Sequence, residues 1–273
     1  MSWFARLTRF WPPVTDSLLR EWGAHDILTL TINRPDRRNA LDPELLTALA
    51  EALRDDGERA SAVILRGAGT EAFSAGYDLS RLTGTIEDLE ADHYIGEAVT
   101  ALRACPAPVI ARLQGHCHGA AVELAMSCDL RIAAADLRLS VPAVSLGVVY
   151  RFQFVARLVQ ICGLARASDF LLAMPELDAE KAAAWGLVTE VSPGSEIDNR
   201  VHTLAEKLAT APRTAVRGTK ASLDLLARRG ISGEDLLLAQ QLREAAAASP
   251  ERLEAVARRK RSMSSRRSSA DKR

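Results

Sequence analysis

An α/β fold with a large core is predicted from two features of the sequence. From His25 onward, short runs rich in β-branched residues alternate with longer amphipathic runs, which is the succession expected of strands and crossover helices. The chain has 273 residues, of which 48% are hydrophobic, and this is enough apolar material to bury a large core. That apolar content also excludes a largely disordered chain.

The predicted elements follow one another along the chain. Residues 26–33 form the first strand, and Asp42 with Pro43 then starts a helix that runs to about residue 55, because Asp caps a helix and Pro fits its first turn. Further strands are predicted at 61–66, 108–113, 130–133 and 187–191. Further helices are predicted at 86–104, 120–128, 196–210, 214–229 and 233–247, with a last one from residue 249.

The formal net charge of zero conceals an uneven distribution. Thirty-five Lys and Arg balance 35 Asp and Glu, but residues 258–273 hold eight basic side chains and one Asp, a local charge of +7, so residues 1–257 carry −7. We predict that 258–273 is a disordered basic tail. It has no aromatic side chains for base stacking, so we do not expect nucleic acid to be the partner of this protein.

Cysteine usage and hydropathy fit a cytoplasmic protein. The four cysteines, at 105, 117, 128 and 162, are too far apart for a CxxC motif, and the longest charge-free run, residues 139–150, is too short to cross a bilayer. Arg6 and Arg9 interrupt any apolar stretch at the N-terminus, so we expect no cleaved secretion signal. Residues 1–24 are interpreted as an N-terminal extension.

Three segments carry residues suited to chemistry. Residues 34–41 form a cationic turn after a strand, which fits a phosphate-bearing ligand. In residues 72–79, Gly76 permits a backbone geometry that leaves the next amide free to point into a pocket. In residues 115–126, small residues lead into a helix whose first amides lack an internal partner. Two such amides aimed at one carbonyl oxygen would form an oxyanion hole.

In their order and spacing, these segments make the sequence resemble the crotonase (enoyl-CoA hydratase/isomerase) superfamily from about Ile27 to Val191. The resemblance implies a ββα spiral core at 25–195 and a helical trimerisation region at 196–257, before the tail at 258–273. It implies an acyl-CoA substrate, a homotrimer or dimer of trimers, and no cofactor, since coenzyme A is part of the substrate.

The resemblance also assigns roles to residues. The backbone amides of Tyr77 and Ala120 match the two oxyanion donors, and Glu123, one helical turn after Ala120, matches a family acid/base glutamate. Arg37 or Arg38 would meet the coenzyme A phosphates. The remaining predicted acyl-CoA contacts are Asn39, Ala40, Leu41, Ala75, Gly76, Asp78, Leu79 and Gly119.

The sequence departs from the hydratase pattern at two places. Ala143 stands where a second glutamate is expected, and Tyr150 follows Leu-Gly-Val, which is similar to the methylmalonyl-CoA decarboxylase branch of the superfamily. One carboxylate suffices to move a proton between two carbons, so isomerisation is easier to support than hydration. Two alternatives remain: decarboxylation of a malonyl-type thioester using Tyr150, and a non-catalytic acyl-CoA binder.

His116 and His118 lie two residues apart, beside the third segment. We expect their side chains to point in opposite directions if the segment is extended, and therefore predict neither a shared metal site nor contact with substrate. We expect Asp78 to bind loop amides, and Cys117 and Cys128 to be core residues.

Overall fold

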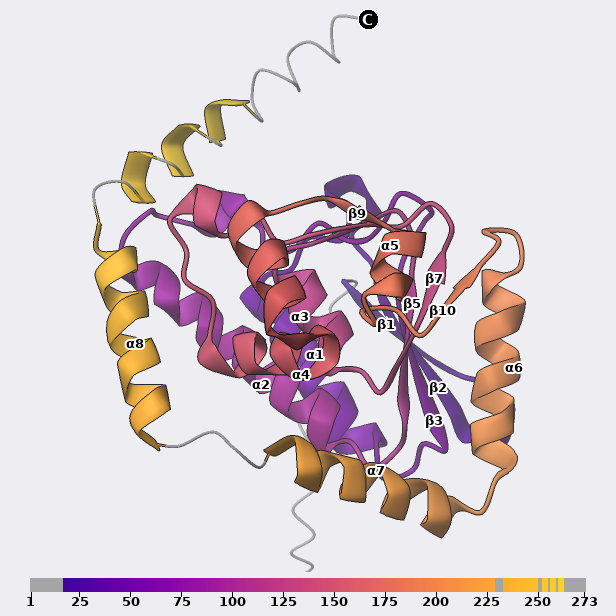
Figure 1. Cartoon of the computed structure of the whole chain (residues 1–273). Helices are drawn as coiled ribbons and strands as arrows, with labels where there is room; N and C mark the ends of the chain where they lie inside the picture. The colour runs from indigo at the N-terminus through magenta and orange to yellow at the C-terminus, as the bar shows by residue number, and fades with distance from the viewer. Residues whose placement is uncertain (1–16, 229–232, 250–251, 255, 259, 263–273) are drawn as a thin grey trace, which may run out of the picture.

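The computed structural model describes residues 17–228, 233–249, 252–254, 256–258 and 260–262. A six-stranded sheet lies at its centre in the order β1-β2-β3-β5-β7-β10 (Figure 1). β1 is antiparallel to β2, and all the other pairings are parallel. The strands are β1 (Leu18–Trp22), β2 (Ile27–Ile32), β3 (Ala62–Gly67), β5 (Val109–Leu113), β7 (Leu130–Ala134) and β10 (Glu190–Ser192).

A second, four-stranded sheet has the order β4-β6-β8-β9. Its strands are β4 (Ala72–Ser74), β6 (His116–His118), β8 (Arg138–Ser140) and β9 (Leu177–Asp178). The chain visits the two sheets in turn: β3 is followed by β4, β5 by β6 and β7 by β8, and a helix follows each pair. This ββα succession confirms the predicted spiral core.

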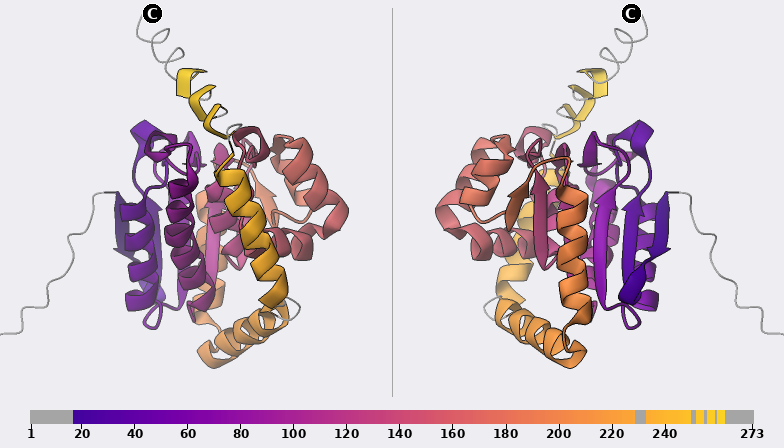
Figure 2. Two further views of the ribbon diagram at one scale, coloured as in Figure 1. Left: turned by 90° about the vertical axis from the view of Figure 1, so that its left-hand side faces the viewer. Right: turned by 90° about the vertical axis from the view of Figure 1, so that its right-hand side faces the viewer.

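Helices cover both faces of the six-stranded sheet (Figure 2). Alternation along β3 explains this: Ala62 and Ile64 pack in a cluster with Val201 of α6, whereas Val63 and Leu65 belong to the larger core on the opposite face. The helices are α1 (Pro43–Asp56), α2 (Glu90–Ala104), α3 (Ala120–Ser127), α4 (Phe152–Ser168), α5 (Ala179–Ala184), α6 (Ile197–Thr210), α7 (Arg213–Arg228) and α8 (Gly233–Ala247).

Shorter helical turns connect these elements. They are the 3-10 helices Ala24–Asp26, Pro35–Arg37, Leu79–Arg81, Ile86–Leu89 and Val144–Leu146, and the π-helical turn Asp169–Ala173. The predicted start of α1 is confirmed, because the Asp42 side chain accepts a hydrogen bond from the Leu45 amide at 2.9 Å.

Residues at both ends of the described chain are more ordered than the sequence analysis expected. β1 lies within the residues assigned to the N-terminal extension, yet it pairs with β2 along its whole length. The prediction of disorder from residue 258 is wrong for 258 and 260–262, which are helical. The Lys260 ammonium donates to the Leu82 carbonyl, and Val256 is buried, so contacts with the body hold this segment. The rest of the predicted tail, 263–273, lies outside the described residues.

Among the residues described, no helix is both long enough and apolar enough to cross a membrane.

Candidate active site

The first two predicted segments lie side by side. The Leu41 amide donates to the Gly76 carbonyl and the Asp78 amide donates to the Leu41 carbonyl, both at 2.8 Å. These two bonds form a parallel bridge between Leu41 and Tyr77 that uses the carbonyl oxygen of Gly76 and the N–H of Asp78. The backbone N–H of Tyr77 therefore takes no part in this bridge.

The third segment meets the second at Gly76. A Cβ atom added to Gly76 would lie 2.4 Å from the His118 carbonyl oxygen and 3.4 Å from the Ala120 nitrogen. Gly76 also has a φ of +87°, a conformation that side chains disfavour. Only glycine permits this close approach, which brings the Tyr77 segment next to the start of α3.

Ala120 is the first residue of α3, so its amide has no acceptor within the helix. Gly119 precedes it with φ +58° and ψ −123°, an orientation that turns the chain sharply into the helix. Every residue of α3 is buried. The helix therefore presents its N-terminal amides from a rigid, enclosed position.

A cavity of about 160 Å³ lies where these segments meet. Eight of the predicted site residues line it, namely Ala75, Gly76, Tyr77, Leu79, Gly119, Ala120, Glu123 and Tyr150. Ala143 also lines the cavity, so the position of the missing second glutamate faces the same space as Glu123. Of the predicted site residues, the structure thus brings together Tyr77 and Ala120 with the Glu123 carboxylate and the Tyr150 phenol.

Glu123 is 2% exposed and forms an ion pair with Arg151. Burial raises the pKa of Glu123 above its ordinary value, and the charge and hydrogen bond of Arg151 oppose part of that rise. Arg151 reaches Glu123 past α2, where Gly96 leaves room: a Cβ there would lie 2.6 Å from an Arg151 guanidinium nitrogen. The sequence analysis missed Arg151.

Tyr150 lies close to the start of α3. Its hydroxyl would be 3.5 Å from a Cβ on Gly119, and its ring packs on Phe154 with centroids 4.9 Å apart. Burial, reinforced by the charge of Glu123, raises the pKa of Tyr150 above its ordinary value. The hydroxyl is therefore a hydrogen-bonding group at this site and stays protonated.

The remaining predicted contacts do not line the cavity: Arg37, Arg38, Asn39, Ala40, Leu41 and Asp78. Asn39 is buried, and its side chain donates to the carbonyls of Ala68 and Ala72, both at 2.9 Å. Asp78 accepts from the Ser80 amide at 3.1 Å, as expected of a loop-binding group. Asn39 and Asp78 hold these loops in place by side-chain bonds.

The cationic turn is largely paired with the protein's own carboxylates. Arg34 pairs with Asp42 at 2.8 Å, Arg37 with Asp78 at 3.1 Å and Arg38 with Glu71 at 3.5 Å. Burial alone would raise the pKa of Asp78, but hydrogen bonds from Ser80 and Arg37 and the charge of Arg34 hold it below its ordinary value. The side chains of Arg37 and Arg38 remain half exposed or more.

Two further residues line the cavity that were not predicted to belong to the site. Asp92 of α2 lines it and is half-buried. Arg252, from the C-terminal segment, also lines it and pairs with buried Asp88 at 2.7 Å. Burial alone would raise the pKa of Asp88, but hydrogen bonds from Thr83, Gly84 and Arg252 hold it below its ordinary value.

The expected orientation of the two histidines is wrong. His116 and His118 lie on β6 with ring centroids 5.0 Å apart, because side chains alternate along a strand and residues two apart share a face. His118 also lines the cavity.

The family model for Enoyl-CoA hydratase/isomerase matches residues 23–261 of this sequence. The chain belongs to the enoyl-CoA hydratase/isomerase family. The superfamily resemblance inferred from the three segments is thereby confirmed, and the chain is an acyl-CoA enzyme of this family.

Relatives within the family differ in the reaction that their names describe. The chain is 32% identical over 202 residues to a short-chain-enoyl-CoA hydratase of Clostridium acetobutylicum, covering 72% of this chain and 77% of that one. It is also 32% identical over 226 residues to a peroxisomal Δ(3,5)-Δ(2,4)-dienoyl-CoA isomerase of Arabidopsis thaliana, covering 77% and 81%.

A solved structure of methylmalonyl-CoA decarboxylase in complex with 2-nitronate-propionyl-CoA shares the fold of this family member. It superposes with a TM-score of 0.81 at 24% identity and covers 88% of this chain and 94% of that one. At this identity the likeness concerns the fold.

Proposed function

We propose that this family member is an enoyl-CoA isomerase that forms a thioester enolate in its cavity. The amides of Tyr77 and Ala120 would donate to the thioester oxygen as negative charge develops on it. Glu123 would remove a proton from C2 of a 3-enoyl-CoA and return it at C4, moving the double bond into conjugation. The coenzyme A is part of the substrate, so this reaction needs no cofactor.

The single observation that carries this proposal is the pairing of Glu123 with Ala143 in one cavity. Glu123 is one helical turn from the Ala120 amide, and burial raises its pKa above the ordinary value of a glutamate, which makes its carboxylate a better base. The methyl side chain of Ala143 can neither donate nor accept a proton, so the position of the second glutamate contributes no acid or base. A reaction that needs one carboxylate is therefore favoured over hydration.

The size of the cavity favours a short acyl group. A volume of about 160 Å³ compares with engineered cavities of about 150 Å³ that hold one benzene. The coenzyme A moiety must then extend outside the cavity. We propose that its phosphates meet Arg37 and Arg38, whose side chains are about half exposed.

Decarboxylation of a malonyl-type thioester is a second candidate, and the position of Tyr150 favours it. Loss of CO₂ gives the same enolate without a base, so the oxyanion amides and a hydrogen-bond donor to the carboxylate would suffice. The protonated Tyr150 hydroxyl beside Gly119 is such a donor.

Product masses separate these reactions in one experiment. We expect a short 3-enoyl-CoA to give a product of unchanged mass with the absorbance of a conjugated thioester, and a long-chain 3-enoyl-CoA to react much more slowly. Hydration would add one water, and decarboxylation of methylmalonyl-CoA would remove CO₂. Binding of every thioester with no new product would favour the non-catalytic binder instead.

The Arg151 charge sets the pH at which Glu123 works as a base. Replacing Arg151 with Met removes both the charge and the hydrogen bond that lower the pKa of Glu123, so that pKa should rise further. Because the base must be deprotonated, the rising limb of the kcat/KM profile should move to higher pH. A pH-rate profile measures this shift.

The matched control for this variant is Arg54→Met, because Arg54 pairs with Glu97 on the surface. It should leave the profile in place. A rising limb that stays fixed or moves to lower pH in Arg151→Met would mean that Glu123 is not the titrating base.

We also propose a homotrimer or dimer of trimers. α7 and α8 lie on the outside of the body (Figure 1), and the C-terminal segments expose several leucines: Leu223 at 62%, Leu237 at 63% and Leu253 at 52%. We propose that another subunit covers these exposed apolar side chains.

A further inference from the structure

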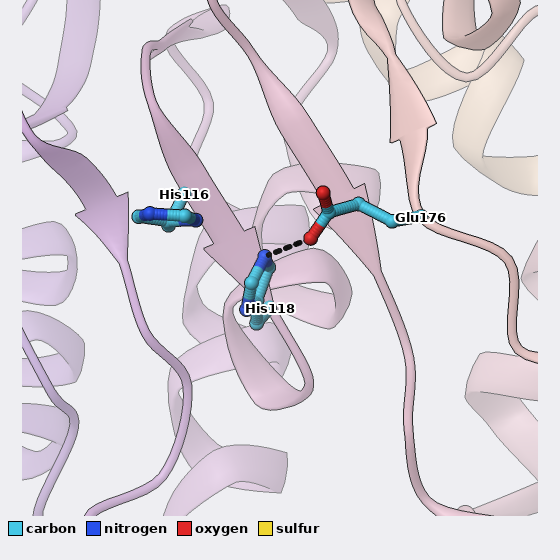
Figure 3. Close-up of side chains that lie close together, drawn as sticks. All are labelled: His116, His118 and Glu176. Atoms are coloured by element: carbon cyan, nitrogen blue, oxygen red, sulfur yellow. Dashed lines mark ion pairs between the residues drawn. The ribbon is translucent and has the colours of Figure 1, made fainter. Parts of the chain in front are cut away.

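Three side chains of types that bind metals in other proteins lie close together (Figure 3). One ligand atom from each of His116, His118 and Glu176 lies within 4.8 Å of the others. His118 Nε2 is 3.7 Å from a Glu176 carboxylate oxygen. None of the three has a part in the proposed isomerisation.

The register of the four-stranded sheet explains why they meet. His118 of β6 pairs with Ser140 of β8, and Leu139 pairs with Leu177 of antiparallel β9. Continuing that register by one residue places Glu176 opposite Ser140. Because Ser140 is small, side chains from the two flanking strands reach each other above it, and the fold itself forms the cluster.

His116 adds an independent observation. Its Nδ1 atom is buried and has no hydrogen-bond partner among the described residues. Buried polar atoms of native proteins nearly always have a partner, in the protein or in a bound ligand or water. An imidazole nitrogen left in this state beside a second imidazole and a carboxylate indicates a site completed by a ligand.

We propose that His116, His118 and Glu176 bind one divalent transition-metal ion of the Zn²⁺ class. Two imidazoles and one carboxylate form a ligand set that suits Zn²⁺ and leaves a fourth position open, whereas Mg²⁺ and Ca²⁺ prefer oxygen ligands. Ligand atoms about 2.1 Å from a tetrahedral Zn²⁺ are about 3.4 Å apart. The 3.7 Å separation of His118 and Glu176 is already close to that value, and the exposed Glu176 is free of packing that would prevent the remaining adjustment.

The site would adjoin the catalytic cavity without belonging to its chemistry. His118 lines the cavity and its carbonyl oxygen touches the Gly76 segment, so a bound ion would fix the end of β6 that leads into Ala120. Binding itself involves no substrate. A test of metal binding therefore succeeds or fails independently of the proposed isomerase function.

The test is a calorimetric titration of the chelator-treated full chain with zinc ions. All variants carry Cys162→Ser, which removes a partly exposed thiol that could bind zinc. We expect one ion per chain. Glu176→Gln, at an exposed position, should weaken binding by about tenfold or more, and His116→Ala should weaken it further. His202→Ala, which removes an exposed imidazole on α6, should leave the affinity unchanged.

Cobalt ions provide a second readout, because four-coordinate Co²⁺ absorbs strongly in the visible range. The band should appear in the parent protein and be lost in His118→Ala, with circular dichroism confirming that each variant is folded. No saturable binding in the parent, or the same affinity in Glu176→Gln, His116→Ala and His202→Ala, would overturn the proposal. In that case the cluster is an ordinary His118–Glu176 ion pair with His116 stacked beside it.

Discussion

Glu123→Gln is expected to lower kcat for 3-enoyl-CoA isomerisation by about 10²- to 10⁴-fold, the range typical for loss of a positioned acid/base. The amide keeps the shape of the carboxylate and its contact with Arg151, but it has no basic oxygen that accepts a proton from C2. Substrate binding should change little, because the proposed contacts of the thioester are to backbone amides and those of coenzyme A lie elsewhere. Steady-state kinetics should therefore show a loss in kcat rather than a rise in KM.

The informative comparison for this variant is Asp92→Asn. Asp92 is a second carboxylate that lines the same cavity, but it comes from α2 and not from the helix that carries the oxyanion amide. If Glu123 acts alone, this substitution should cost less than about tenfold. Equal losses in the two variants would indicate two cooperating carboxylates, which is the requirement for hydration.

Gly76→Ala is expected to lower kcat by about 10²- to 10³-fold, the effect of losing an oxyanion donor. The new methyl group would lie 2.4 Å from the His118 carbonyl oxygen, far inside van der Waals contact, at a residue with φ +87°. The strand end or the loop must then move apart. That movement would displace the Tyr77 amide relative to the Ala120 amide, so the two would no longer form the proposed oxyanion hole.

Gly218→Ala on α7 is the matched control for that substitution, because a Cβ there meets nothing within 4 Å. It should leave both kcat and the melting temperature close to those of the parent. If Gly76→Ala stays folded by circular dichroism and retains the parent's kcat, the Tyr77 amide does not contribute to an oxyanion hole.

The long elements of the fold were predictable because their periodicity extends over many residues. The helix Pro43–Asp56 has both its cap and its apolar stripe visible in the sequence, and five strands of the larger sheet were placed within a few residues. The strands of the smaller sheet are two or three residues long, too short for any period to show. The edge strand Leu18–Trp22 precedes the point from which alternation was recognised.

Predictability of the site differed between backbone and side-chain features. The family resemblance assigned roles to Tyr77, Ala120 and Glu123, and the structure places all three at one cavity. Arg151 was missed because its partner lies 28 positions away, and nothing local to Arg151 reveals that contact. The orientation of the two histidines was mispredicted because residues two apart were assigned to opposite faces of a strand, whereas they share one face.

The position of the proton during the reaction tests the central claim most directly. A 3-enoyl-CoA carrying deuterium at C2 should give a 2-enoyl-CoA with part of that deuterium at C4, because one carboxylate, 2% exposed to solvent, removes and returns it. Nuclear magnetic resonance of the product locates the label. Isomerised product with no deuterium at C4, or no isomerisation at all, would contradict a mechanism in which Glu123 alone carries the proton.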